Sequence, residues 1–336
     1  MRGLAVLAGV FAMTTRVDLA HAVPSLDLSQ IDLRLQRIAE VEVGAALTQF
    51  KAKSVAVVVA QPATGTIIAF AEAHSEPAAE TWTKRTFAPG STTKPFVVAA
   101  ALESGAVSED EILDCSQPYD VGGRAFKNHD PKVKKVSMTE AIAQSVNVCT
   151  IKMAQAAGEK RVRHTLQQFG LDWRTDRRSD GQELSADDAE DVLGVTLPAN
   201  LASMIRAYSI LANHGRRLAS PSQQVISEKT ADAIVRMLVA AVDHGTGRKA
   251  ALSRVAVAGK TGTVVSRLEP KMSDSNGPVM AMFGGFAPAE APRLVAFVIV
   301  EGGMRGKEHA GGGAAAAPTF REVMGKSLGV LDQGVR

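Results

Sequence analysis

Two groups of apolar, β-branched runs lie far apart in the chain, and they constrain its fold more than any other feature. The first group is SVAVVVA (54–60) and TIIAFAEA (66–73), which flank the turn QPATG. The second is RVAVAGKTGTVV (254–265), MAMFGGFAPA (280–289) and RLVAFVIVE (293–301). Each group has the pattern of hairpin strands, but an isolated hairpin is only marginally stable in water. We therefore expect both groups to pair into one antiparallel sheet.

The segment between these groups, about residues 92–250, has the periodicity of helices. Ser137, with Glu140 three residues later, has the pattern of a helix N-terminus. Further helices are expected over the apolar stripe of LPANLASMIRAYSILANHGRR and over residues 227–245. The expected fold class is α+β, with an antiparallel sheet flanked by terminal helices and an inserted all-α lobe over about 92–250. A cleft between the sheet and such a lobe is a natural position for a site.

The two ends of the chain suggest its organisation. A basic start, the short apolar run GLAVLAGVFAM and the small-residue sequence Ala-His-Ala predict a signal peptide over residues 1–22. Residues 23–50 are expected to be a linker that passes into an N-terminal helix, and 51–330 to form one domain that closes with a helix at 317–328. These features predict an exported protein of the periplasm or cell envelope, with cleavage expected rather than a retained membrane anchor.

Charge and cysteine content narrow the function classes. The formal net charge is +3 and aromatic residues make up 4% of the chain, which argues against nucleic-acid binding and an aromatic-lined groove. Cys115 and Cys149 are the two cysteines. An even count permits one disulfide in an oxidising compartment, but nothing in the sequence places the two within bridging distance. We therefore expect two buried, free thiols.

The stretch PGSTTKPF contains the first candidate for chemistry. Ser91 and Lys94 are three residues apart, so they can meet on one face of a helical turn as a nucleophile and its base. The same spacing is common on surfaces that carry no chemistry. Pro89-Gly90 indicates a turn that places Ser91 at a helix N-terminus, where backbone N–H groups can bind an oxyanion. Pro95 disfavours a regular helix at this point, so we expect a distorted, 3₁₀-like first turn.

Two further segments carry polar residues at suggestive spacings. Ser145 and Asn147 in QSVNVC can both face a cleft only if the helix breaks between them. In GKTGTVV, Lys260 and Thr261 alternate as on a strand, and Gly262 leaves the backbone open to a ligand. An ammonium group and threonine hydroxyls together suit a carboxylate. Taken singly, the first segment could be a polar spot on a helix, and the second a strand end with a turn glycine.

In this order, S-x-x-K, S-x-N and K-T-G-T match the motif set of penicillin-binding proteins and serine β-lactamases. The flanking segments FAPGSTTKPF, TLPANLASMIRAYSILANHGR, HGTGRKA and GGFAPAEAPRLVAFVIVE also agree in type and order. The chain resembles the transpeptidase domain of class B penicillin-binding proteins over roughly residues 50–328. The resemblance implies a serine D,D-transpeptidase that acts on D-Ala-D-Ala peptidoglycan stem peptides through an acyl-enzyme and is acylated by β-lactams.

The resemblance also implies a role for each matching residue. Ser91 would be the acylated nucleophile, Lys94 would take its proton, and Ser145 would relay a proton to the leaving amine. Asn147 would hold Lys94 and the substrate amide. The substrate carboxylate would lie among Lys260, Thr261, Gly262 and Thr263, and the backbone N–H groups of Ser91 and Thr263 would form the oxyanion hole. No cofactor, metal or nucleic acid is implied, and cell-wall synthesis proteins are conceivable partners.

The chain departs from the family pattern at several points. Val146 and Val264 stand where Ser and Ala are usual, and only about 30 residues separate the expected cleavage point from the first strand, where class B proteins usually carry a long pedestal domain. The E-x-x-L-N signature of class A β-lactamases is absent, and Asn147 stands where class D enzymes usually have Val. A transpeptidase is thus favoured over a β-lactamase. A D,D-carboxypeptidase of the same fold, or a penicillin-binding sensor or scaffold without turnover, stays open.

Overall fold

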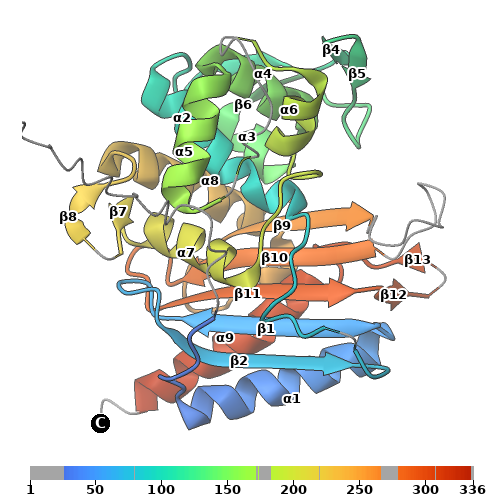
Figure 1. Ribbon diagram of the computed structural model, residues 1–336, viewed down its shortest axis with the longest axis vertical. Helices are drawn as coiled ribbons and strands as arrows, with labels where there is room; N and C mark the ends of the chain where they lie inside the picture. Colours follow the sequence, from blue (N-terminus) through green and yellow to red (C-terminus); the bar gives the residue numbers. More distant parts are fainter. Residues whose placement is uncertain are drawn as a thin grey trace, which may run out of the picture.

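The computed structural model describes residues 26–333 except 79, 172, 174–182, 219, 266–278 and 307. Its centre is a five-stranded antiparallel sheet with the strand order β2-β1-β11-β10-β9 (Figure 1). The strands are β1 (Ser54–Ala60), β2 (Ile67–His74), β9 (Ala258–Val265), β10 (Val279–Ala287) and β11 (Leu294–Glu301). The two groups of apolar runs therefore do meet in one sheet, and β9 lies at its edge.

Side chains of the central strands enter two different cores. Val55, Val57 and Val59 of β1 pack in the cluster that also contains residues of the two terminal helices. Ala56 and Val58 point the other way and pack with residues of the inserted lobe. Because successive side chains of a strand face opposite sides of the sheet, a strand buried on both faces is apolar throughout. This burial explains why the sequence shows continuous apolar runs instead of alternation.

The terminal helices α1 (Leu33–Phe50) and α9 (Ala316–Gln333) cover one face of the sheet, and Figure 1 shows them beside each other. Asp32 caps α1 by accepting hydrogen bonds from the backbone N–H groups of Arg34 and Leu35. Lys326 of α9 donates a hydrogen bond to the Glu42 carboxylate of α1 at 2.6 Å. The expectation of a sheet flanked by terminal helices is confirmed.

The inserted lobe packs on the opposite face and around the β9 edge (Figure 1). Its helical elements are η2 (Gly90–Thr93), α2 (Lys94–Ser104), α3 (Met138–Ala143), α4 (Asn147–Ala157), α5 (Glu159–Phe169), α6 (Ala186–Val192), α7 (Leu201–Ala212), α8 (Glu228–Asp243) and η3 (Arg248–Ala250). Ser137 and Ser227 are the N-caps of α3 and α8, as the sequence predicts.

The lobe is not purely helical, which corrects one part of the expected architecture. It also contains short antiparallel strand pairs. These strands are β3 (Ile112–Asp114) with β6 (Lys135–Ser137), β4 (Tyr119–Val121) with β5 (Arg124–Phe126), and β7 (Arg216–Arg217) with β8 (Ser220–Gln224). Strands of two to five residues are too short and too polar to show a periodic pattern. One more short pair, β12 (Met304–Arg305) with β13 (Glu308–His309), lies beyond the sheet.

The expectation of two free cysteines is wrong, because Cys115 and Cys149 form a disulfide with a Cα–Cα distance of 5.4 Å. The β3–β6 pairing folds the chain back here, so that the residue after β3 reaches the first turn of α4. These short strands were invisible in the sequence, and so was the proximity that they create. Among the described residues, no helix combines the length and the apolar character needed to cross a membrane. The predicted signal peptide, 1–22, lies outside the described residues.

Candidate active site

Ser91 lies in the 3₁₀ turn η2, directly before the α-helix that begins at Lys94. This is the distorted first turn that Pro95 predicts. Two threonine hydroxyls close the turn: Thr92 Oγ1 donates to Pro89 O at 2.6 Å, and Thr93 Oγ1 donates to Gly90 O at 2.9 Å. The Ser91 side chain is partly exposed, and its hydroxyl has no hydrogen-bond partner among the described residues. It is therefore the one hydroxyl of this turn left available to a ligand.

The Ser91 turn (Gly90–Thr93) is anchored from two sides. Gly90 has φ +55°, and its N–H donates to Gly194 O at 2.9 Å. A Cβ atom on Gly194 would lie 2.4 Å from Gly90 O, so the two backbones approach more closely than any side chain would allow. From the lobe core, the Tyr208 hydroxyl donates to Thr92 O at 2.9 Å. Burial raises the pKa of Tyr208 well above its ordinary value, so this group remains a donor.

The second segment faces the turn because its helix breaks, as expected. Helix α3 ends at Ala143, Ser145 adopts a left-handed φ of +59°, and α4 begins at Asn147. The break brings both side chains onto Lys94. The Lys94 ammonium group donates to Asn147 Oδ1 at 2.6 Å, to Ser145 O at 2.7 Å and to Ser145 Oγ at 3.3 Å. All three donors of one ammonium group are thereby used.

Two lysines are fully buried in this site. Lys94 and Lys260 both have an exposed fraction of 0%. Burial and the neighbouring charge of Lys260 hold the pKa of Lys94 well below its ordinary value. Burial lowers the pKa of Lys260 to about 7. Ser145 and Asn147, in contrast, are partly exposed. The partly exposed side chains of Ser145 and Asn147 therefore lie in front of the buried Lys94 amine, whose lowered pKa favours the neutral form.

The third segment is the edge strand β9. Lys260 donates to Thr261 O at 3.2 Å, and the Thr261 and Thr246 hydroxyls share a hydrogen bond of 2.7 Å. Thr263 is exposed, and its Oγ1 accepts a hydrogen bond from Gly312 N at 3.0 Å. The side chains of Lys260, Thr261 and Thr263 are therefore distributed over the two faces of the strand, with Thr263 towards solvent.

The structure requires a glycine at position 262 for a different reason from the one expected. A Cβ atom there would lie 2.9 Å from both Pro89 O and Thr92 Cγ2. The group that approaches this glycine closely is the Ser91 turn itself, and this contact sets the turn directly against β9. The unusual Val264 packs here too, because a Cβ on Gly90 would lie 2.5 Å from its methyl group. The unusual Val146 is 3% exposed and belongs to the lobe core.

Sequence reasoning missed three residues that hold this site together: Thr246, Tyr208 and Asn128. Thr246 lies in HGTGRKA and links β9 to the lobe, since its hydroxyl also donates to Ala143 O at 3.3 Å. Tyr208 is visible in the sequence only as one apolar position of a helical stripe. Asn128 accepts a hydrogen bond from the Val148 N–H of α4. In the sequence, each of these residues is a single side chain within an otherwise ordinary segment, so no pattern marks it as part of the site.

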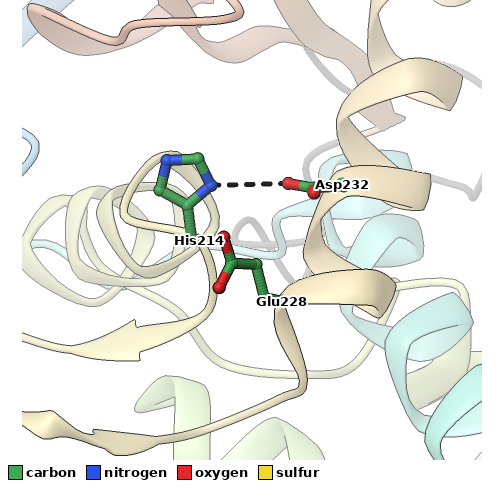
Figure 2. Close-up of side chains that lie close together, drawn as sticks. All are labelled: His214, Glu228 and Asp232. Carbon is green, nitrogen blue, oxygen red and sulfur yellow. Dashed lines mark hydrogen bonds and ion pairs between the residues drawn. The ribbon is translucent and has the colours of Figure 1, made fainter.

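A second polar cluster lies away from the Ser91 and Lys94 site, where the end of α7 meets α8 (Figure 2). His214 Nδ1 and Asp232 Oδ1 are 3.4 Å apart, and Glu228 pairs with Arg216 at 3.4 Å. Exposed pairs of this kind contribute little to stability. These contacts account for the positions of all three side chains in Figure 2, and the cluster is not part of the candidate site.

Comparisons with known proteins show which family this chain resembles. Residues 55–325 match the family model described as the penicillin binding protein transpeptidase domain. The chain is 30% identical over 344 residues to the peptidoglycan D,D-transpeptidase FtsI of Escherichia coli, covering 93% of this chain and 57% of that protein. It is 28% identical over 333 residues to the probable peptidoglycan D,D-transpeptidase PenA of Neisseria gonorrhoeae, covering 90% and 56%. The chain thus spans somewhat more than half the length of these relatives.

Solved structures show the same architecture. The transpeptidase domain of the FtsI4 D,D-transpeptidase from Legionella pneumophila is 37% identical, with a TM-score of 0.74 over 90% of this chain and 99% of that one. The apo transpeptidase domain of penicillin-binding protein 3 from Burkholderia pseudomallei is 24% identical and shares the fold, with a TM-score of 0.78 over 90% and 96%. A sheet with two terminal helices, a lobe that carries Ser91 and Lys94, and a family model that matches most of the sequence lead to one conclusion: this chain belongs to the penicillin-binding protein transpeptidase family.

Proposed function

We propose that the protein is a serine D,D-transpeptidase of the cell envelope, which acts on peptidoglycan stem peptides ending in D-Ala-D-Ala. The observation that carries the proposal is the buried Lys94 ammonium group, which contacts both Ser145 and Asn147 and lies one helical turn from Ser91. A protein that only needed a stable fold would gain nothing from a buried lysine next to a second buried lysine, since each charge costs free energy to desolvate.

Acylation follows from these positions. Ser91 Oγ attacks the carbonyl carbon of the penultimate D-Ala, and neutral Lys94 takes the hydroxyl proton. Collapse of the tetrahedral intermediate breaks the bond to the last D-Ala, and Ser145 passes a proton to the departing amine. The product is an ester between Ser91 and the shortened peptide, plus free D-Ala. The amine of a neighbouring stem peptide then attacks this ester, forms the cross-link and releases Ser91.

The low pKa of Lys94 supports its role as the base. A lysine with its ordinary pKa would be almost wholly protonated at neutral pH and could not accept the proton of Ser91. Burial, together with the charge of Lys260, favours the neutral form. The hydrogen bond from Lys94 to Asn147 Oδ1 acts in the opposite direction, because it stabilises the protonated form that exists after proton transfer. The site can therefore hold both states of the amine.

The remaining groups suit the anionic parts of the substrate. We assign the terminal carboxylate to Lys260, Thr261 and Thr263, which offer an ammonium group and two hydroxyls along β9. The oxyanion would be bound by the backbone N–H groups of Ser91 and Thr263. Since β9 is the edge strand, half of its backbone N–H groups point away from β10 and can serve a ligand. A β-lactam would be attacked in the same way and would remain as an ester on Ser91.

Labelling with a fluorescent penicillin tests the proposal. The wild type should become labelled, and Ser91→Ala should not. Ser104→Ala is the matched control, since Ser104 is the last residue of α2, the helix that follows the Ser91 turn, and its hydroxyl donates to Ala101 O. Equal labelling of wild type and Ser91→Ala, or no labelling of the wild type, would sink the acyl-serine mechanism.

The fate of the acyl group is tested with a stem pentapeptide and a D-amino acid acceptor. A transpeptidase gives the exchanged peptide as its main product, whereas a D,D-carboxypeptidase gives the tetrapeptide and free D-Ala. Steady turnover of a chromogenic cephalosporin, at about 1 s⁻¹ or faster, would instead show a β-lactamase. Each outcome is a different product, so one set of reactions separates the three activities.

A further inference from the structure

Helix α4, which begins with Asn147, has no capping side chain of its own. Its N-cap residue is Val146, whose side chain cannot accept a hydrogen bond from the N–H groups of the first turn. The first backbone N–H groups of a helix have no partner within the helix and need one elsewhere. Here the partner comes from a distant segment, because the Val148 N–H donates to Asn128 Oδ1 at 3.0 Å.

Asn128 is itself held in place by its other amide atom. Its Nδ2 donates to Cys115 O at 2.8 Å, and Cys115 is joined by the disulfide to Cys149. Cys149 follows Val148, the residue that Asn128 caps. The Cys115–Cys149 disulfide and the two hydrogen bonds of Asn128 therefore join the residue after β3, the Asn128 segment and the first turn of α4 into one closed ring. Both the oxygen and the nitrogen of the Asn128 amide take part in it.

The residue before Asn128 orients the side chain of Asn147. Lys127 O accepts a hydrogen bond from Asn147 Nδ2 at 3.3 Å, and Asn147 Oδ1 accepts the bond from Lys94 at 2.6 Å. A carboxamide whose NH₂ group is bound to a carbonyl must turn its oxygen the other way. The segment between β5 and β6 thus decides which end of Asn147 faces the lysine.

We propose that Asn128 is a positioning residue for the transpeptidase reaction, which holds the start of α4 so that Asn147 stays within hydrogen-bond distance of Lys94. The inference rests on the proposed function, in which Lys94 is the base. Asn128 touches neither the nucleophile nor the base. It acts through Val148 and the first turn of α4.

A pH profile separates this role from a merely structural one. Among the described residues, the charged groups coupled to Lys94 are Lys260 on β9 and His129, beside Asn128. Burial and the charge of Lys94 lower the pKa of His129. Because Asn147 Oδ1 stabilises protonated Lys94, displacing Asn147 should lower the pKa of Lys94 further. The acid limb of the acylation profile, where the rate falls as Lys94 becomes protonated, should then move to lower pH.

The experiment measures the rate constant of acylation by a fluorescent penicillin against pH for four proteins. Asn128→Ala should be at least about tenfold slower than wild type on the plateau, since small displacements of a catalytic group have large effects on rate, with its acid limb at lower pH. Asn128→Asp keeps the acceptor for Val148, so it should retain more of the rate. Its added negative charge should move the acid limb to higher pH. Ser227→Ala removes the comparable cap of α8, where Thr230 N donates to Ser227 Oγ, and should match the wild type.

The proposal is overturned if Asn128→Ala acylates as the wild type does, or if it is slower with an unmoved acid limb. Amide hydrogen exchange at Val148 provides a test that does not depend on activity. Exchange should be faster in Asn128→Ala than in the wild type, and equal exchange would refute the capping role. An unlabelled wild type would refute the proposed function instead, so the two failures are distinguishable.

Discussion

Breaking the Cys115–Cys149 disulfide should lower the free energy of unfolding by about 3.8 kcal/mol at 25 °C. The two cysteines are 34 residues apart, and the value follows from the loop-closure entropy of a chain segment of that length. A loss of this size is a large part of the roughly 5–15 kcal/mol that stabilises most domains. The perturbation is reduction of the wild type, which changes no side-chain volume. The double variant Cys115→Ala/Cys149→Ala should give a similar value.

Urea unfolding followed by tryptophan fluorescence measures the effect. Trp82 and Trp173 are both 0% exposed, so their emission should report loss of the packed state. The loop-closure argument is refuted if the oxidised and reduced proteins differ by less than about 1 kcal/mol, well below the expected range.

The same samples show where the disulfide acts. If it mainly restricts the unfolded chain, reduced but folded protein should keep its acylation rate within about threefold, because the hydrogen bonds of Asn128 persist. Loss of acylation from protein that is still folded would mean that the bond holds the native site itself.

Three further outcomes are expected. Gly194→Ala should slow acylation and lower stability, since its Cβ would lie 2.4 Å from Gly90 O. The control is Gly105→Ala, where φ is a similar +70° but the space around the residue is open. This variant should lower the free energy of unfolding by only about 1 kcal/mol and leave acylation unchanged. Lys260→Met removes a charge beside Lys94, so the pKa of Lys94 should rise and the acid limb of acylation should move to higher pH; an unmoved limb would show that burial alone sets this pKa. The pKa of Lys260 is lowered from 10.5 to about 7, so between these pH values the unfolded chain binds more protons than the folded one, and the stability of the wild type should rise with pH. In urea titrations at several pH values, Lys260→Met should show a smaller rise. An equal rise would contradict the assignment of this lowered pKa to Lys260.

Much of the fold could be predicted because the sequence patterns that indicate its strands and helices extend over many residues. The strands of the sheet are runs of seven to nine residues, and burial on both faces makes the central strands β1, β10 and β11 almost wholly apolar. The break between α3 and α4 was also predictable, since Ser145 and Asn147 could meet in a cleft only if the helix ended between them. In each case a local pattern and a requirement of the whole fold agree.

The parts that escaped prediction depend on contacts between distant short segments. The disulfide needs the β3–β6 pairing, whose strands have three residues each. Asn128 caps a helix that begins 19 residues later, and its own neighbours look like an ordinary polar loop. Gly262 looked like an opening for a ligand, because only the folded chain shows that Pro89 fills the space.

The missing side chain of Gly262 also constrains the alignment of β9 in the folded sheet. Gly262 pairs with Met282 of β10, and a shift by one residue in either direction would bring Thr261 or Thr263 to its place. Even a methyl group there would lie 2.9 Å from Pro89 O. A misaligned edge strand therefore cannot close against the turn that carries Ser91. The contact between these two distant segments therefore opposes a one-residue slip of β9, which would displace Lys260 and the threonines.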